Sequence, residues 1–298
     1  MSAPETLTLA SLRVARFNGP QLGVLGDPIA HSLSPAMHNA AIATLAPTQP
    51  QLSGLSYHRL HITADELPEA LRLLHAAGFI GVNLTVPHKI AALTLVDSLS
   101  PAARRAASVN TLVRTTEGWD GHTTDGAGFL EALHESSGAT VRHREVILLG
   151  SGGAARAVAA ACLDATCASL RLYNRDRQRA VDLAHALNDP RVTAASLDEI
   201  EAPAADAVIV NCTVLGLKAA DPSPFPATLL KAGQFVFDTT YGPTPSRLLL
   251  DAQANGVSHA DGRAMLRWQG ALAFRLWTGI LPPAAPMRAA LGEKTAQP

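Results

Sequence analysis

Several short segments of the chain carry side chains of the kinds that bind and protonate small organic molecules. The segment "NLTVPHK" holds Asn83, Thr85 and Lys89 around a proline. An ammonium can donate a proton and stabilise developing negative charge, and amide and hydroxyl groups can bind a hydroxylated molecule. A cation is mildly unfavourable in the first turn of a helix, so a lysine at position 89 suggests either a negatively charged partner or a functional role. If Lys89 is considered in isolation, the alternative interpretation is an ordinary surface lysine.

A second segment, "IAHSLSP", places two hydroxyl groups two residues apart. If Ser32 and Ser34 are extended, both side chains project the same way, and together they suit a carboxylate beside a helix start. The alternative is that Ser34 is only the N-cap of a helix with Pro35 at its first position. Asn110 in "SVNTLV" and Asp125 in "TTDG" add an amide and a carboxylate, although Asp125 also suits a helix N-cap.

The strongest single motif is "EVILLGSGGAARAV", in which an apolar run ends in glycines before a helical pattern. Gly150, Gly152 and Ala155 match the pattern G-x-G-x-x-A. The first glycine permits a tight turn, the second lets a pyrophosphate approach the backbone, and the small third residue allows close helix packing. The motif predicts dinucleotide binding at a helix N-terminus, and its alternative is a structural turn.

The type of dinucleotide is indicated by the segment "YNRDRQRA", at the end of the next predicted strand. Arg175, Arg177 and Arg179 follow Asn174, and guanidinium groups suit a ribose 2′-phosphate, whereas NAD sites usually present an acidic residue. Asp176 brings a negative charge to the same place, and the arginines could also be a solvated helix start. NADP is favoured, and NAD stays possible.

The elements that must position these residues follow an alternating pattern of apolar runs and helical stretches, typical of βαβ units. We expect strands at 21–26, 57–62, 79–86 and 108–114, with helices at 34–45, 65–77 and 87–96. After Asp125 the pattern restarts with strands at 145–150, 169–174, 206–213, 234–241 and 257–260 and helices at 154–165, 246–255 and 263–280. In such sheets ligands gather beyond the carboxyl ends of the strands, where Asn83 and Thr85 would share one face.

This order predicts an α/β protein of two domains. Residues 1–124 and 262–298 are expected to form an α/β substrate domain with a mostly parallel sheet. Residues 125–261 are expected to form a Rossmann-like, dinucleotide-binding domain.

Bulk properties exclude several classes of function. Of 298 residues, 47% are hydrophobic and 16% charged, with a net charge of −1, so neither a nucleic-acid footprint nor a membrane span is expected. The three cysteines have no metal-site or disulfide spacing, and no metal is expected. The first twenty residues lack the apolar core of a secretion signal, so the expected location is cytoplasmic.

Taken together, nine segments make the chain resemble the shikimate dehydrogenase family. They occur in the family's order and cover nearly the whole chain: "IAHSLSP", "NLTVPHK", "ASVNTLVR", "TTDG", "GSGGAARA", "YNRDRQRA", "NCTVLG", "DTTYGP" and "DGRAMLRWQGA". The resemblance implies NADP-dependent, reversible reduction of 3-dehydroshikimate to shikimate, a step of the shikimate pathway to chorismate and the aromatic amino acids.

The resemblance also implies roles for residues at matching positions. Lys89 and Asp125 would form the catalytic pair, with Lys89 as general acid. The substrate site would comprise Ser32, Ser34, Asn83, Thr85, Asn110, Tyr241 and Gln269. The cofactor site would comprise Gly150, Ser151, Gly152, Gly153, Ala154, Asn174, Arg175, Arg179, Thr213 and Gly262. A monomer or homodimer is expected.

The chain departs from the family pattern in places. Asp176 replaces the usual threonine beside the arginines, and Thr123 stands where the family often has asparagine. Two alternatives therefore stay open: a quinate/shikimate dehydrogenase that uses NAD, and a sensor that binds ligand without turnover. An intact Lys89–Asp125 pair argues against the sensor.

Overall fold

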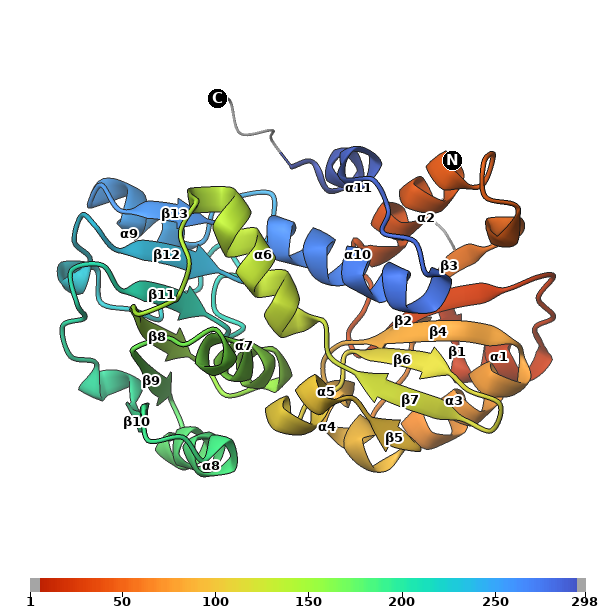
Figure 1. The fold of residues 1–298 in the computed structure, drawn as a ribbon, viewed down its shortest axis with the longest axis horizontal. Coiled ribbons are helices and arrows are strands. Elements are labelled where there is room, and N and C mark those ends of the chain that lie inside the picture. The colour runs from red at the N-terminus through yellow and green to blue at the C-terminus, as the bar shows by residue number, and fades with distance from the viewer. Residues whose placement is uncertain (1–5, 294–298) are drawn as a thin grey trace. The chain divides into compact units, whose positions relative to one another are not determined.

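The computed structural model describes residues 6–293, which form two compact units (Figure 1). The first unit extends to Thr124 and is completed by residues from Gln269 onward, and the second is Asp125–Trp268. The chain returns to the first unit within the helix α10 (Arg263–Thr278), which continues across the boundary between the two units. No helix among residues 6–293 is both long enough and apolar enough to cross a membrane.

The first unit is built on a mixed sheet of seven strands in the order β1-β3-β2-β4-β6-β7-β5. The strands are β1 Thr6–Thr8, β2 Gln21–Gly26, β3 Ser56–His61, β4 Phe79–Leu84, β5 Ser98–Leu99, β6 Thr111–Arg114 and β7 Trp119–His122. Strands β1 to β4 run parallel, whereas β6 is antiparallel to both β4 and β7. The expected strands at 57–62, 79–86 and 108–114 are therefore present: β3 is shifted by one residue, β4 ends two residues earlier than expected, and β6 begins three residues later.

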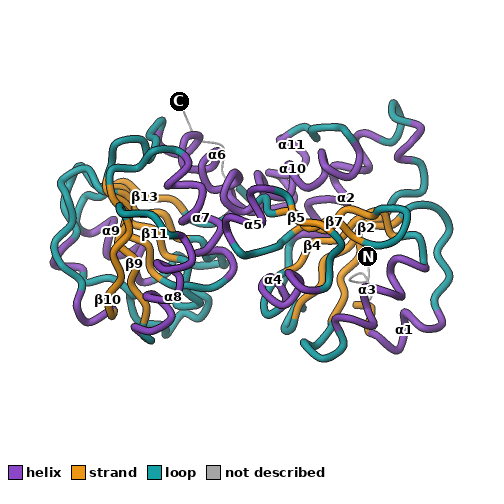
Figure 2. Tube along the Cα trace, turned by 60° about the horizontal axis from the view of Figure 1, so that its bottom comes forward, coloured by secondary structure: helices purple, strands orange, loops and turns teal. Residues whose placement is uncertain are grey.

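Helices cover both faces of this sheet (Figure 2). They are α1 Leu9–Val14, α2 Ser34–Leu45, α3 Leu67–Ala76, α4 His88–Ala91, α5 Pro101–Ala106, the second half of α10, and α11 Ala284–Leu291, with 3₁₀ turns at Pro50–Leu52 and Ala92–Thr94. Helices α1 and α3 pack together on one face, and α2, α10 and α11 lie on the other.

Strand β3 shows the two-residue period that separates these faces. His58 contacts Phe79 with ring centroids 5.9 Å apart, on the α1/α3 side. Tyr57 lies in the opposite core with Phe274, on the α2/α10 side, and His61 Nε2 lies 2.8 Å from Asp27 Oδ1. Every second residue of β3 thus faces the α2/α10 side.

The described part of the N-terminal stretch adds one strand and one helix to the first unit. Strand β1 pairs in parallel with β3, and Leu9 and Leu12 of α1 are buried against the α3 side. Thr8 caps α1 through a reciprocal pair of hydrogen bonds with Ser11, a capping box. Arg13 binds Glu69 of α3 through two hydrogen bonds of 3.0 and 2.9 Å.

The second unit contains an all-parallel sheet of six strands in the order β10-β9-β8-β11-β12-β13. The strands are β8 Glu145–Leu149, β9 Ser169–Asn174, β10 Val192–Ser196, β11 Val208–Asn211, β12 Phe235–Asp238 and β13 Ser258–Ala260. Central strands are buried on both faces, which explains their nearly continuous apolar sequences. The predicted Rossmann-like sheet is confirmed.

The helices of the second unit pack on both faces of the parallel sheet. They are α6 Asp125–Ser137, α7 Gly153–Asp164, α8 Arg177–Leu187, α9 Arg247–Ala254 and the first turns of α10, with 3₁₀ turns at Leu197–Glu199 and Ala227–Leu229. Leu248 and Leu249 of α9 share a core with Ile147 of β8. On the other face α6 packs beside α7, and Phe129 of α6 meets Phe237 edge-on at 5.2 Å.

Candidate functional site

The start of α2 places Ser32 and Ser34 next to each other, but not as the sequence suggested. Ser34 is the first helical residue, and Leu33 occupies the N-cap position without a side-chain hydrogen bond. The prediction that Ser34 caps the helix is therefore wrong. Instead the Ser34 amide donates to the Ser32 hydroxyl oxygen at 3.3 Å, and Arg59 of β3 donates to the Ser32 carbonyl at 2.8 Å.

The carboxyl ends of β2 and β4 are joined by backbone hydrogen bonds just before this helix. The Thr85 amide donates to Leu25, and the Asp27 amide donates to Val86, both at 2.9 Å. A Cβ on Gly26 would lie 2.4 Å from the Thr85 methyl group, so only glycine allows the two turns to approach this closely. Thr85 is half-buried at this edge, one residue beyond β4.

Asn83 and Asn110 lie in a buried network of amides and hydroxyls. Asn83 Nδ2 donates to the Asn110 carbonyl at 3.1 Å and to the Thr111 hydroxyl at 3.0 Å. Asn110 Oδ1 accepts from the Thr124 amide at 2.8 Å, and Asn110 Nδ2 donates to Gln269 Oε1 of α10 at 3.1 Å. Three of the predicted substrate residues, Asn83, Asn110 and Gln269, are thus brought together.

Lys89 lies in the single turn of α4, directly after this edge. His88 beside it is fully buried, and its Nε2 is 2.8 Å from the Ile62 carbonyl. Burial lowers the pKa of His88, so the imidazole is neutral and anchors the turn. The Lys89 carbonyl accepts from the Val109 amide at 2.8 Å, and the Lys89 side chain is half-buried. The backbone of Lys89 is therefore fixed to the residue that precedes Asn110.

In the second unit, the glycine turn between β8 and α7 has the features expected of a dinucleotide cradle. Gly150 has φ +107°, and a Cβ there would lie 2.9 Å from the Cys212 carbonyl oxygen, so glycine is required. Gly152 is the N-cap of α7 without any side-chain cap, and a Cβ there would meet no atom within 4 Å. Gly153 and Ala154 begin the helix, and Ala155 is fully buried. The open space at Gly152 and the uncapped helix start fit a pyrophosphate.

The end of β9 carries the residues predicted to choose between the two nicotinamide dinucleotides. Asn174 donates to the Ser151 hydroxyl of the glycine turn, so the two segments are joined. Arg175 and Arg179 are exposed. Asp176 is the N-cap of α8: its carboxylate accepts from the Gln178 amide at 3.1 Å and lies 3.5 Å from Arg179 Nε. The negative charge of Asp176 is therefore directed to the α8 start and to Arg179.

The carboxyl ends of β11 and β12 are tied together by buried polar side chains. Asn211 donates to Asp238 at 2.9 Å, and the Thr213 hydroxyl donates to Asn211 Oδ1 at 2.7 Å. Burial raises the pKa of Asp238, against hydrogen bonds from Ser246, Thr240 and Asn211 that lower it. Thr213 thus has a fixed orientation at the same edge of the sheet as the glycine turn.

The remaining predicted residues of the second unit lie in three further segments. Tyr241 follows β12, and burial raises the pKa of its phenol while Arg263 opposes the shift. Gly262 precedes α10, and a Cβ there would lie 2.1 Å from the Thr239 carbonyl oxygen, so its small size serves close packing. Asp125 is the first residue of α6 and follows Thr124 directly.

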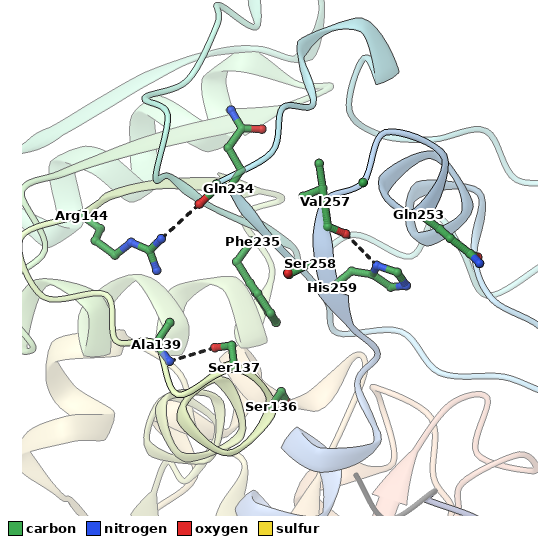
Figure 3. Close-up of a pocket in the computed structure, with 12 residues that line it drawn as sticks. Ser136, Ser137, Ala139, Arg144, Gln234, Phe235, Gln253, Val257, Ser258 and His259 are labelled. Atoms are coloured by element: carbon green, nitrogen blue, oxygen red, sulfur yellow. Dashed lines mark hydrogen bonds between the residues drawn. The ribbon is translucent and has the colours of Figure 1, made fainter. Parts of the chain in front are cut away.

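A cavity of about 600 Å³ in the second unit contains none of the predicted residues (Figure 3). It is lined by Phe235 and Ser258, the first residues of β12 and β13, and by Arg144, which precedes β8. The cavity therefore lies at the amino ends of the strands, opposite the edge where parallel sheets bind ligands. The Arg144 guanidinium already contacts Asp206 at 3.6 Å and the Gly233 carbonyl at 3.5 Å. Among residues 6–293, no group of three or more His, Cys, Asp or Glu side chains could hold a metal ion.

Several residues of the buried network were missed by sequence reasoning. Tyr57 donates to Asn83 Oδ1 at 2.7 Å, and Thr111 and Thr124 link Asn83 to Asn110. The period of β3 could have indicated Tyr57, because this residue has the same parity as Arg59 and His61. Thr111 follows Asn110 directly, but nothing in its sequence position distinguishes it from an ordinary strand threonine.

An all-parallel sheet with a glycine turn at the start of a helix defines a dinucleotide-binding α/β protein, here joined to a second α/β unit with a buried polar site. Three family models match the chain: the shikimate dehydrogenase substrate binding domain at residues 24–112, shikimate/quinate 5-dehydrogenase at 132–216, and the shikimate 5′-dehydrogenase C-terminal domain at 262–291. The chain belongs to the shikimate dehydrogenase family, and the predicted resemblance is confirmed.

Individual relatives are similar along nearly their whole length. A protein named shikimate dehydrogenase (NADP(+)) from Symbiobacterium thermophilum is 41% identical over 294 residues, covering 95% of this chain and 98% of that relative. A shikimate 5-dehydrogenase from Thermus thermophilus, solved in complex with NADP(H) and shikimate, has a TM-score of 0.80 at 39% identity, covering 91% and 98%. A quinate dehydrogenase from Corynebacterium glutamicum, solved with NAD, has a TM-score of 0.81 at 30% identity, covering 93% and 99%.

Proposed function

We propose that the protein is an NADP-dependent shikimate dehydrogenase that reversibly reduces 3-dehydroshikimate to shikimate. The observation that carries this proposal is the match to a relative named shikimate dehydrogenase (NADP(+)), which covers 95% of the chain at 41% identity. Asn83 and Thr85, expected to bind the substrate, lie at the carboxyl end of β4, and the glycine turn, expected to bind the cofactor, lies at the carboxyl end of β8, where such sheets bind ligands. Bound NADP(H) supplies or accepts the hydride at the substrate ring carbon.

Lys89 is our candidate for the general acid. Its ammonium donates the proton that the alkoxide oxygen needs during reduction, and in the reverse direction the neutral amine removes the proton from the shikimate hydroxyl. The backbone of Lys89 is held at Val109, next to Asn110, which supports a fixed position close to the amide network. Asp125 is proposed to orient this ammonium by a charge-assisted hydrogen bond.

Ser32 and Ser34 are proposed to bind the substrate carboxylate, and Asn83, Asn110 and Gln269 its hydroxyl side. The hydrogen bond from the Ser34 amide to Ser32 keeps the two serine residues together. Thr85 and Tyr241 are proposed to complete the pocket. The glycine turn, Asn174, Arg175, Arg179, Thr213 and Gly262 are proposed to bind the cofactor.

NADP(H) rather than NAD(H) is supported by the exposed arginines after β9. Asp176 was the residue that left NAD possible as the cofactor. Its carboxylate accepts a hydrogen bond from the Gln178 amide of α8 and lies near Arg179. We further propose that the protein works in the cytoplasm as a monomer or homodimer. The three cysteines of the chain are free, which agrees with a reducing compartment.

The test is oxidation of shikimate by the purified protein with NADP⁺ or NAD⁺, followed by nicotinamide absorbance. We expect turnover of shikimate, with NADP⁺ preferred. In the same assay Lys89→Ala should lower kcat by about 10²–10⁴-fold, the usual contribution of general acid–base catalysis, without changing NADP⁺ binding.

The matched control is Lys231→Ala, which removes an exposed lysine of the second unit. This variant should keep wild-type rates. Absence of shikimate oxidation with either cofactor would overturn the activity, and a Lys89→Ala enzyme with near wild-type kcat would remove Lys89 from the acid role.

A further inference from the structure

Arg156 lies in the first turn of α7, directly after the glycine turn of the second unit, and is not among the predicted cofactor residues. Gly152 is the N-cap of this helix, so Arg156 is its fourth residue. The side chain is half-buried, and its Nε atom is buried without a hydrogen-bond partner. Within residues 6–293 the guanidinium makes no hydrogen bond and no ion pair. A partly desolvated positive charge therefore has no contacting counter-charge in the described part of the chain.

This arrangement of Arg156 is unfavourable without an anion. Two other partly buried arginines of the second unit are paired: Arg171 lies 2.9 Å from Glu145, and Arg191 lies 2.7 Å from Asp189. The amino end of a helix is the positive end of its dipole, so a cation in the first turn is disfavoured. Burial lowers the pKa of Arg156, because desolvation disfavours the charged form. An anion bound beside the guanidinium would offset all of these costs.

Arg156 lies on the side of α7 that faces α8. Strands β8, β9 and β10 are neighbours in this order, so right-handed crossovers place α7 and α8 on the same face of the sheet. Asp182 of α8 opposes the lowering of the Arg156 pKa by its negative charge, which shows that the two side chains are close. The Asp182 carboxylate is not an ion-pair partner of Arg156 and instead accepts a hydrogen bond from Gln178 at 2.8 Å.

The same side of the second unit carries the arginines proposed to choose the cofactor. Arg175 follows β9 directly, Arg179 lies in the first turn of α8, and both are exposed. The hydrogen bond from Asn174 to Ser151 joins the end of β9 to the glycine turn. In a dinucleotide-binding domain the adenosine ribose lies at the end of this second strand. Arg156 thus approaches the region of the ribose from α7, as Arg175 and Arg179 do from β9 and α8.

We propose that Arg156 is a further determinant of cofactor choice, which binds the ribose 2′-phosphate of NADP(H) from α7. The inference rests on the proposed function, because that function supplies the cofactor and its site. A guanidinium pairs with phosphate oxygens through two parallel hydrogen bonds, each assisted by charge. NAD(H) has a neutral hydroxyl at the same position and cannot form such a pair. Arg156 therefore stabilises bound NADP(H) and contributes little to bound NAD(H).

The test is the binding of two probes, adenosine 2′,5′-bisphosphate and adenosine 5′-monophosphate, measured by titration calorimetry on the intact protein. The probes differ only in the 2′-phosphate, and neither requires turnover. The variant Arg156→Met removes the charge and keeps a long, unbranched side chain on α7. We expect its affinity for the bisphosphate to fall at least about tenfold, because a hydrogen-bonded charge pair is lost. Its affinity for the monophosphate should stay within about twofold of wild type.

The matched control is Arg142→Met, which removes an exposed arginine just before β8, at the amino edge of the same sheet. This variant has the same change of charge and should bind both probes like the wild type. Arg156→Lys keeps the charge but loses the planar fork, so we expect an affinity for the bisphosphate between those of the wild type and Arg156→Met. It also carries the test if Arg156→Met does not fold, since the bisphosphate alone should then bind more weakly than to the wild type.

Two results would overturn the role of Arg156. One is wild-type affinity for the bisphosphate in folded Arg156→Met. The other is an equal loss of affinity for both probes, because Arg156 would then act on the part of the nucleotide that the probes share. In either case oxidation of shikimate by the wild type would still uphold the proposed function. Conversely, binding of the bisphosphate that depends on Arg156, without any oxidation of shikimate, would uphold the inference and overturn the proposed activity.

Discussion

His38 is the residue whose burial has the clearest consequence for stability. It lies 0% exposed between Tyr57 and Phe274, and neither ring nitrogen has a hydrogen-bond partner within residues 6–293. Desolvation lowers its pKa from 6.5 to about 3. A protonated His38 is therefore incompatible with the folded core.

The sign of the resulting pH dependence follows from the lowered pKa. The stabilisation is complete above pH 6.5, the unfolded value, and is lost as the pH falls from there toward 3. At about pH 5 the loss is roughly 2 kcal/mol, from about 1.4 kcal/mol per pH unit. We predict that His38→Phe removes this loss, as measured by urea unfolding at pH 7.5 and pH 5.

The control for this prediction is His185→Phe on the exposed side of α8. That variant should keep the wild-type difference between the two pH values. If His38→Phe and the wild type lose the same free energy of unfolding on acidification, burial of His38 does not govern the acid side of the stability curve.

Individual residues were predicted from sequence only where a motif fixed their surroundings. The glycine turn at Gly150 could be predicted, because a tight turn at positive φ demands a missing side chain. Ser34 was wrongly expected to cap α2, because the same residue types serve caps and ligands. Tyr57 and Thr111 could not be predicted, since their roles depend on which side chains lie opposite them in neighbouring strands.

At the scale of elements, the turn between β8 and α7 separates two uses of glycine. Gly150 is needed for folding, because its φ is +107° and a side chain would meet Cys212. Gly152 has open space around it, so a side chain there costs the fold little and occupies the place of a phosphate.

We predict opposite phenotypes for the two alanine variants. Gly152→Ala should keep the melting temperature and the KM for shikimate but raise the KM for NADP⁺ at least about tenfold, measured by steady-state kinetics. Gly150→Ala should lower the free energy of unfolding by about 1–3 kcal/mol, measured by denaturant titration. An unchanged KM for NADP⁺ in Gly152→Ala would place the phosphates elsewhere.

Most elements could be predicted because their patterns are local. The strands β2, β8, β9 and β13 and the helices α7, α9 and α10 fall within a few residues of the expected ranges. Short elements such as β5 and β7 were missed, because two to four residues carry too little periodicity. The mixed order of the first sheet also could not be predicted, since antiparallel pairing of β6 depends on contacts distant in sequence.

At the scale of the whole molecule, each unit has its own core. Most of the proposed substrate residues lie in the first unit, whereas the glycine turn and the end of β9 lie in the second. We predict that each ligand alone protects a different set of amides from hydrogen exchange. NADP⁺ should protect residues 150–156 and 174–179, and shikimate should protect residues 32–34 and 83–89, measured by mass spectrometry of the intact protein. Protection by NADP⁺ confined to the first unit would contradict the assigned cofactor site.

The chain passes from the first unit to the second after Thr124 and returns after Trp268. This order decides which unit is completed first during synthesis. The second unit is one continuous stretch, so all of its strands leave the ribosome before residue 269. The core of the first unit also needs Phe274 and Trp277, which contact His38 and Tyr57 and are synthesised after the second unit. The second unit can therefore fold on the nascent chain before the first unit is complete. The first unit was begun earlier, but its core is completed only when the second half of α10 has been synthesised.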